Sequence, residues 1–206
     1  MNLPQKLAQG LTELRLEVDA ATQQKLLDYL ALLEKWNKVH NLTAVREPAE
    51  MVTLHLLDSL SVLPYIKSGR LLDVGSGAGL PGIPLALLRP ELQVTVMDSS
   101  HKKASFMRQA KATLGITNLE VVCGRVEEYR PPHLFDVIIS RAFSDLAEFI
   151  RLTAHLRVAE GFWLAMKGVY PYDEIAQLKG ISTEVLPVKV PGLEAQRHLV
   201  FIKADS

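Results

Sequence analysis

The chain has 206 residues, of which 48% are hydrophobic and 22% are charged, a composition typical of a globular protein and not of a disordered one. Its 23 basic and 23 acidic side chains cancel, so the sequence lacks the net positive charge common among nucleic-acid-binding proteins. The single cysteine, Cys123, excludes an intrachain disulfide. The sequence shows neither a signal-peptide layout nor an apolar run of the roughly 20 residues that span a membrane. We therefore expect a cytoplasmic protein without a membrane partner.

The N-terminal third of the sequence shows helical spacing. Apolar residues recur at helical intervals over residues 19–40, with Asp19 as the N-cap and Asn41 as a left-handed end. A second helix is predicted over residues 48–63, because proline suits a first helical turn and another proline follows the segment. We expect a helical region over residues 1–66.

Strands and helices alternate in the rest of the chain. Strands are predicted at residues 71–74, 94–97, 119–123, 135–140 and 162–166, and helices at 81–88, 101–114, 144–156 and directly after Pro171. This alternation is typical of a parallel sheet flanked by helices. Two further strands, at 183–190 and 198–203, are joined by too short a segment for a parallel crossover. The pattern predicts an α/β domain over residues 67–206, with a seven-stranded, mostly parallel sheet and an antiparallel last strand.

A glycine-rich turn, Asp73-Val74-Gly75-Ser76-Gly77-Ala78-Gly79-Leu80-Pro81-Gly82, follows the first predicted strand. Glycines there let a ligand approach the backbone, and the helix N-terminus supplies hydrogen-bond donors. Gly77, Gly79 and Gly82 also satisfy G-x-G-x-x-G, so a nicotinamide or flavin dinucleotide is an alternative ligand. A turn without a ligand is a further alternative.

Two features favour S-adenosylmethionine over a dinucleotide. The carboxylate of Asp73, at the end of the first strand, would repel a pyrophosphate but suits an ammonium or sulfonium group. The antiparallel last strand also departs from the all-parallel dinucleotide fold. Asp98, at the end of the second strand, does not discriminate, because an acid there binds ribose hydroxyls in either cofactor.

The glycine-rich turn resembles the first motif of class I S-adenosylmethionine-dependent methyltransferases, which have a Rossmann-like fold. More narrowly, the chain resembles the bacterial small-subunit ribosomal RNA guanine-N7 methyltransferases, also called the glucose-inhibited division protein B family, over nearly its whole length. The other segments that carry this resemblance are Trp36-Asn37-Lys38, Asn41-Leu42-Thr43, His55-Leu56-Leu57-Asp58-Ser59, Arg125-Val126-Glu127-Glu128, Ser140-Arg141-Ala142-Phe143, Lys167-Gly168 and Arg197-His198-Leu199-Val200.

The resemblance implies a site for S-adenosyl-L-methionine, with S-adenosyl-L-homocysteine as the product. The turn would hold the methionine end, the second strand the ribose, and a later segment the adenine, while Arg141 would lie between cofactor and substrate. The implied substrate is a guanine in the helix 18 loop of 16S rRNA (rRNA position 527), within the small ribosomal subunit and near its decoding site. The expected cofactor-binding residues are Asp73, Gly75, Gly77, Gly79, Leu80, Asp98, Ser99, Ser100, Val126, Glu127 and Arg141.

The residues present suit methylation of a ring nitrogen. The segment after the fourth strand lacks the Asn/Asp-Pro-Pro-aromatic run of amino-methylating enzymes, and Cys123 follows the third strand, which disfavours a cysteine adduct. Guanine N7 carries a free lone pair and needs no base, so the protein supplies mainly alignment, which contributes roughly 7–11 kcal/mol. We assign Arg141 to orienting the base, as the catalytic residue, and Phe143 to stacking on it.

Charge gives the remaining predictions. Lys167, Arg197 and His198 are expected at the RNA-facing rim, with a solvated surface as the alternative. His55 and Asp58 share a helical face and are expected to hydrogen-bond to each other. No His or Cys cluster has metal-ligand spacing, so we expect no metal, and we expect a monomer.

Two other functions stay open on sequence alone. One is a dinucleotide-dependent oxidoreductase, and the other is a binding protein that responds to S-adenosylmethionine without catalysing a reaction.

Overall fold

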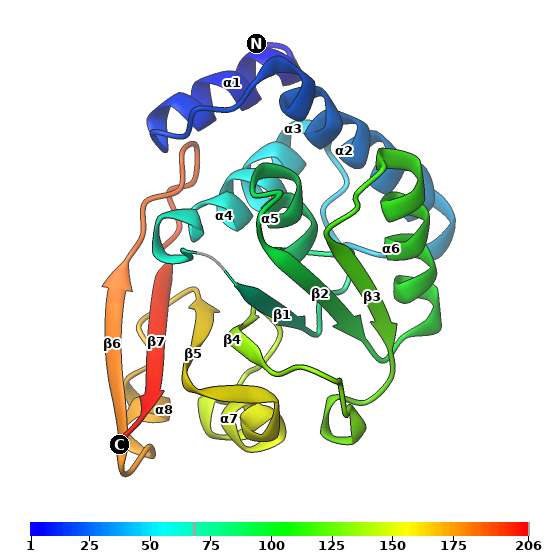
Figure 1. The fold of residues 1–206 in the computed structure, drawn as a ribbon. Coiled ribbons are helices and arrows are strands. Elements are labelled where there is room, and N and C mark those ends of the chain that lie inside the picture. The colour runs from blue at the N-terminus through cyan, green and yellow to red at the C-terminus, as the bar shows by residue number, and fades with distance from the viewer. Residues whose placement is uncertain (68, 206) are drawn as a thin grey trace.

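Seven strands form one sheet in the computed structural model, which describes residues 1–67 and 69–205 (Figure 1). The order across the sheet is β3-β2-β1-β4-β5-β7-β6. Strands β1 to β5 are parallel, whereas β7 runs antiparallel to both β5 and β6, as predicted. The strands are β1 (Arg70–Val74), β2 (Gln93–Asp98), β3 (Leu119–Cys123), β4 (Phe135–Ser140), β5 (Arg157–Lys167), β6 (Ile181–Pro187) and β7 (His198–Ala204).

Capping residues set the ends of the long helices. Helix α2 (Ala20–His40) begins where the Asp19 carboxylate accepts a hydrogen bond from the backbone N–H of Thr22, and it ends at Asn41, whose φ is 51°. These positions confirm the prediction. The other helices of the α/β region are α5 (Gly82–Leu88), α6 (His101–Leu114), α7 (Leu146–Thr153) with a 3₁₀ turn η4 (Ala154–Leu156), and α8 (Tyr172–Ala176).

The N-terminal region differs from the prediction at two places. Helix α1 (Leu3–Glu13) was not predicted, although Asn2 and Gln5 form a capping box at its start. The helix predicted over residues 48–63 is confirmed as helical but is not one regular helix. It consists of α3 (Pro48–Met51), a π-helix η1 (Val52–Leu57) and α4 (Asp58–Leu60), and a 3₁₀ turn η2 (Leu63–Tyr65) follows.

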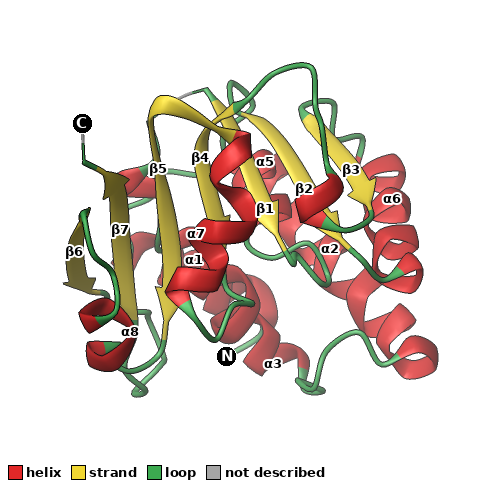
Figure 2. Cartoon of the chain, turned by 90° about the horizontal axis from the view of Figure 1, so that it is seen from below, coloured by secondary structure: helices red, strands yellow, loops and turns green. Residues whose placement is uncertain are grey.

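Helices cover both faces of the sheet. In Figure 2, α7 crosses one face, and α2, α5 and α6 lie against the other. The hydrophobic core on the α2 side is continuous from the N-terminal helices to the sheet, and it includes Leu26, Leu33, Val94 and Phe106. The helical region over residues 1–66 is therefore a layer of this face. Within the described ranges, each helix is too short or too polar to cross a membrane.

Candidate functional site

The glycine-rich turn lies at the carboxyl end of β1, where it forms one wall of a cavity of about 230 Å³. Parallel strands commonly bind ligands at this edge of a sheet. The cavity is enclosed by the turn, by the segment before α3 and by the loop after β4. Its lining residues are Leu42, Thr43, His55, Gly75, Ser76, Gly77, Ala78, Leu80, Arg141 and Ala142.

Gly75 brings the turn close to the loop that follows β4. Its φ is +67°, and a Cβ atom at this position would lie 2.8 Å from the Cβ atom of Ala142. A larger residue would therefore be strained and would crowd this wall of the cavity. Gly75 lines the cavity, and its contact with a cofactor stays a prediction.

Asp73 stabilises the glycine-rich turn through hydrogen bonds. Its side chain is fully buried, and Oδ2 accepts hydrogen bonds from Ser76 Oγ at 2.6 Å and from the backbone N–H of Gly82 at 2.8 Å. Burial raises the pKa of Asp73 to about 7, since its charged form loses hydration. Asp73 lies outside the cavity lining and stabilises the turn, and its role beside a cationic cofactor stays a prediction.

Asp98 connects the turn to α6. Oδ2 accepts from the backbone N–H of Gly77 and Oδ1 from that of Ser100, both at 2.9 Å. Each oxygen of a carboxylate has a second lone pair, so Asp98 retains acceptor capacity for a ligand. Ser99, beside it, is exposed, and the Ser100 side chain caps α6.

The segment after β3 contains the two residues predicted to hold adenine. Val126 and Glu127 belong to a 3₁₀ turn, η3 (Val126–Glu128), and Glu127 forms an ion pair with Arg125 at 2.6 Å. The predicted cofactor residues other than Arg141 therefore lie at or after the carboxyl ends of the adjacent strands β1, β2 and β3, and of these Gly75, Gly77 and Leu80 line the cavity. Gly79 belongs to the glycine-rich turn but does not line the cavity, and a Cβ atom at this position would clash with the Ile83 side chain.

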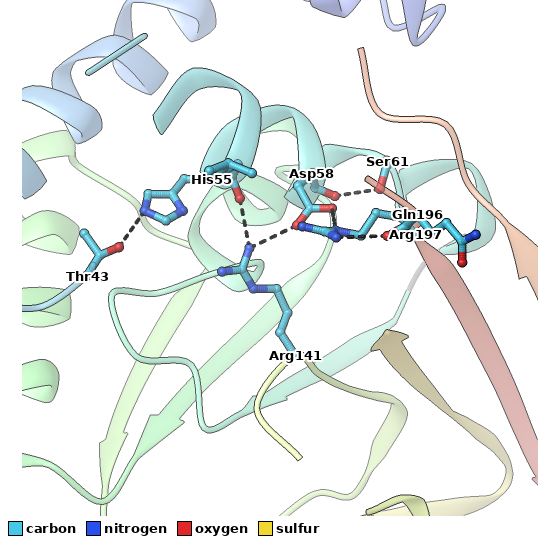
Figure 3. Close-up of polar contacts among 8 residues, drawn as sticks. Thr43, His55, Asp58, Ser61, Arg141, Gln196 and Arg197 are labelled. Carbon is cyan, nitrogen blue, oxygen red and sulfur yellow. Dashed lines mark hydrogen bonds and ion pairs between the residues drawn. The ribbon is translucent and has the colours of Figure 1, made fainter. Parts of the chain in front are cut away.

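Arg141, from the loop after β4, points toward α4 (Figure 3). Its Nη1 atom donates to the carbonyl oxygen of Leu54 at 3.3 Å and lies 3.5 Å from Asp58 Oδ2. Arg197 contacts the other oxygen of the same carboxylate, with Nε at 3.3 Å from Oδ1. Burial raises the pKa of Asp58, and the two guanidinium groups offset part of this effect.

His55 contacts Thr43 and not Asp58, which makes the predicted His55–Asp58 hydrogen bond wrong (Figure 3). Nε2 of the imidazole lies 2.9 Å from Thr43 Oγ1. His55 lies in the π-helix, which has more residues per turn than an α-helix. Residues three apart, such as His55 and Asp58, therefore do not share one face of it. Burial, together with the positive charge of Arg141, lowers the pKa of His55 to about 4, so the ring is neutral at pH 7.

A second cavity, of about 390 Å³, adjoins the first and shares His55 and Arg141 with it. Arg141 therefore lies where the two cavities meet. The second cavity is bounded by the helical segment of residues 52–60 and by the ends of β5 and β7. Its lining residues are Val45, Leu54, His55, Asp58, Ser61, Arg141, Met166, Lys167, Gly168, Val188, Arg197, His198 and Leu199.

Three of the four predicted substrate-binding residues line this second cavity. Lys167 Nζ lies 2.9 Å from Glu174 and donates to the carbonyl oxygen of Phe143 at 2.7 Å. Nδ1 of His198 lies 2.8 Å from the carbonyl oxygen of Gly168. The Phe143 ring does not line the cavity: it stacks on Phe149, with the ring centroids 5.0 Å apart, as part of the core on the α7 face.

The comparison with known proteins decides the family. The family model described as rRNA small subunit methyltransferase G matches residues 22–200. The chain belongs to this family. The resemblance seen in the sequence is thereby confirmed.

Relatives in this family match along nearly the whole chain. The ribosomal RNA small subunit methyltransferase G of Methylobacillus flagellatus is 61% identical, and the match covers 98% of this chain and 98% of the relative. The protein of the same name from Laribacter hongkongensis is 55% identical, over 97% of this chain and 98% of the relative.

Solved structures confirm the class I methyltransferase fold. A putative O-methyltransferase from Klebsiella pneumoniae superposes with a TM-score of 0.63 at 13% identity, covering 100% of both chains. The glycopeptide N-methyltransferase MtfA gives a TM-score of 0.62 at 14% identity, covering 77% of this chain and 100% of that one. At this identity the likeness concerns the fold alone.

Sequence reasoning missed three polar residues as members of the site, namely Thr43, His55 and Asp58. A signal was present, because all three belong to segments that carry the family resemblance. The partners of Asp58 lie 83 and 139 positions away, and only the folded arrangement shows these contacts.

Proposed function

We propose that this methyltransferase transfers the methyl group of S-adenosyl-L-methionine to N7 of a guanine in the helix 18 loop of 16S rRNA, and releases S-adenosyl-L-homocysteine. Membership of the rRNA small subunit methyltransferase G family is the observation that carries this proposal. We further propose that the protein acts as a cytoplasmic monomer on the small ribosomal subunit. A structured ribosomal surface suits a chain with no net charge better than naked RNA does.

The smaller cavity has the features that the cofactor requires. Gly75 and Gly77 present backbone on one wall, and Leu80 adds apolar surface for the methionine end. Asp98 lies outside this lining, but it accepts a hydrogen bond from Gly77, which lines the cavity, and it has free lone pairs for the ribose hydroxyls. When bound, the cofactor supplies an electrophilic methyl group on a sulfonium.

The larger cavity suits the acceptor base. Guanine N7 carries no proton, so the reaction requires orientation and not a general base. This agrees with the neutral, buried state of His55, which is held by Thr43. In the proposed reaction Arg141 orients the guanine from the junction of the two cavities, without donating to N7, because that lone pair is the nucleophile.

Family membership also bears on the alternatives. A nicotinamide-dependent oxidoreductase requires dinucleotide binding at Gly77, Gly79 and Gly82, whereas the family and the structural neighbours are methyltransferases. A non-catalytic response protein is disfavoured on the same ground.

One experiment tests the proposal directly. Small subunits from cells that lack this gene are incubated with the protein and S-adenosyl-L-methionine, treated with borohydride and aniline, and examined by reverse transcription. We expect a single strong stop at one guanine in the helix 18 loop, and a weaker one with protein-free 16S rRNA. A stop elsewhere, or no methyl incorporation, would contradict the proposal. Calorimetry with NAD as the ligand tests the oxidoreductase alternative separately.

A further inference from the structure

Asp58 connects three segments that are distant in the sequence. It lies at the start of α4, while Arg141 follows β4 and Arg197 directly precedes β7. Figure 3 shows Arg141 and Arg197 both beside Asp58, and their guanidinium groups contact different oxygens of its carboxylate. The Asp58 side chain is 8% exposed, whereas those of Arg141 and Arg197 are 28% and 26% exposed. The carboxylate is therefore the buried member of the cluster, and the arginines face the cavity.

The cluster leaves one positive charge uncompensated at the larger cavity. Arg141 and Arg197 share the single negative charge of Asp58, and Lys167 is already paired with Glu174. Guanidinium groups bind phosphate oxygens through two parallel N–H groups. A phosphodiester group carries one negative charge, which matches the excess.

Donors also remain available in the cluster. Each guanidinium group has five N–H donors. Within the described part of the chain, Arg141 uses only Nη1, for Leu54 and Asp58, and Arg197 uses Nε and Nη1, for Asp58 and its neighbour Gln196. The Nη2 groups of both arginines are left for a ligand.

We propose that Asp58 is a positioning residue that holds Arg141 and Arg197 as a two-arginine clamp for an RNA phosphate next to the acceptor guanine. This inference rests on the proposed function, because it takes RNA as the substrate. Arginine side chains lose considerable conformational entropy when they bind a ligand, and a buried carboxylate that fixes them beforehand reduces this loss.

The direction in which Asp58→Asn changes RNA binding distinguishes a positioning role of Asp58 from a purely electrostatic one. Asp58→Asn makes the cavity more positive, so charge alone predicts tighter RNA binding. Loss of the clamp predicts weaker binding. We expect Asp58→Asn to raise the KM for small subunits roughly tenfold, while the Kd for S-adenosyl-L-methionine stays within about twofold of wild type. Log KM should also depend less on log salt concentration, with the slope smaller by about one for the lost phosphate contact.

A double-mutant cycle with Arg197→Gln tests whether Asp58 acts through its partner. The double variant should lose less than the sum of the two single losses, because Asp58 acts partly through Arg197 and partly through Arg141, and Asp58→Glu should restore part of the loss. Asp28→Asn, an exposed change of the same chemical kind on α2, is the matched control and should leave KM and the salt slope unchanged. If Asp58→Asn does not fold, Arg197→Lys replaces it, since it keeps the charge, loses the planar fork and should likewise raise KM.

The outcomes distinguish the two proposals. Wild-type protein that methylates the expected guanine, together with an Asp58→Asn or Arg197→Lys variant whose KM is unchanged or lower, would overturn the clamp alone. Additive losses in the cycle would also overturn it. Wild-type protein that leaves the small subunit unmodified would overturn the proposed function and the RNA clamp together.

Discussion

Two carboxylates, those of Asp73 and Asp98, support the glycine-rich turn, and their surroundings give them different properties. Asp73 has no exposed surface, and within the described residues its Oδ1 atom is buried without a hydrogen bond. Asp98 accepts backbone hydrogen bonds with both oxygens, one of them from Gly77, which lines the smaller cavity. Asp98 is therefore suited to hold a ligand, and Asp73 to hold the turn.

Replacement of Asp98 and Arg141 should separate binding from transfer. We expect Asp98→Ala to raise the Kd for S-adenosyl-L-methionine at least tenfold, because hydrogen bonds to charged groups contribute about 1.5–3 kcal/mol. Arg141→Ala should change this Kd little and should lower the single-turnover rate on small subunits. Calorimetry and single-turnover kinetics measure the two effects. Wild-type activity in both variants would show that the cofactor and acceptor sites lie elsewhere.

Asp73 should make stability depend on pH in a defined direction. Its pKa is about 7 in the folded protein and near 3.8 when unfolded, so the folded state binds the extra proton between these values. The free energy of unfolding should therefore fall as the pH rises from about 4 to about 7, by at most about 1.4 kcal/mol per pH unit. Urea unfolding of wild type and Asp73→Asn across this range checks the prediction. The free energy of unfolding of the variant should lack this decrease with pH. An equal dependence on pH in both proteins would contradict the prediction.

At the scale of elements, α2 is joined directly to the glycine-rich turn. The buried Tyr29 hydroxyl donates to the carbonyl oxygen of Ala78 at 2.7 Å, across 49 positions of sequence. Ala78 lines the smaller cavity. The N-terminal helical region thus fixes the backbone of the turn from outside the α/β region.

Tyr29→Phe should weaken cofactor binding while it preserves packing. The variant leaves the Ala78 carbonyl group without its buried donor, so we expect the Kd for S-adenosyl-L-methionine to rise about two- to tenfold. Tyr65→Phe removes a hydroxyl from a partly exposed tyrosine that packs on Phe201, and it serves as the control. An unchanged Kd in Tyr29→Phe would show that the turn keeps its shape without this bond.

Local signals in the sequence predicted most elements. Short apolar runs gave the strands, and capping residues such as Asp19 gave helix ends, because both effects act within a few residues. The π-helix escaped prediction because π-helices are rare, and the proline signals that predicted a helix over residues 48–63 mark where a helix begins and ends, not its hydrogen-bond pattern. The partners of Asp58 lie 83 and 139 positions away, so local pattern carries no information about them. The complete burial of Asp73 also depends on tertiary packing, so the sequence pattern did not predict it.

At the scale of the whole molecule, the continuous core predicts that residues 67–206 do not fold alone. Leu26 and Leu33 of the helical region pack in the same cluster as Val94 and Phe106. Removal of residues 1–66 would expose this face of the sheet to water. We expect one cooperative thermal transition for the full chain and none for the shortened one, as measured by circular dichroism. A shortened protein that unfolds cooperatively and binds the cofactor would contradict this view and would establish two independent domains.

The ion pair between Asp58 and Arg197 also has a consequence for how the chain folds. It closes a loop of 139 positions, whereas the helices on either side depend on contacts a few residues apart. Structures dominated by distant pairings form slowly, because chain entropy must be lost before these contacts form. We therefore expect secondary structure to form early during refolding, and the contact between Asp58 and Arg197 to form only when the β6–β7 hairpin docks.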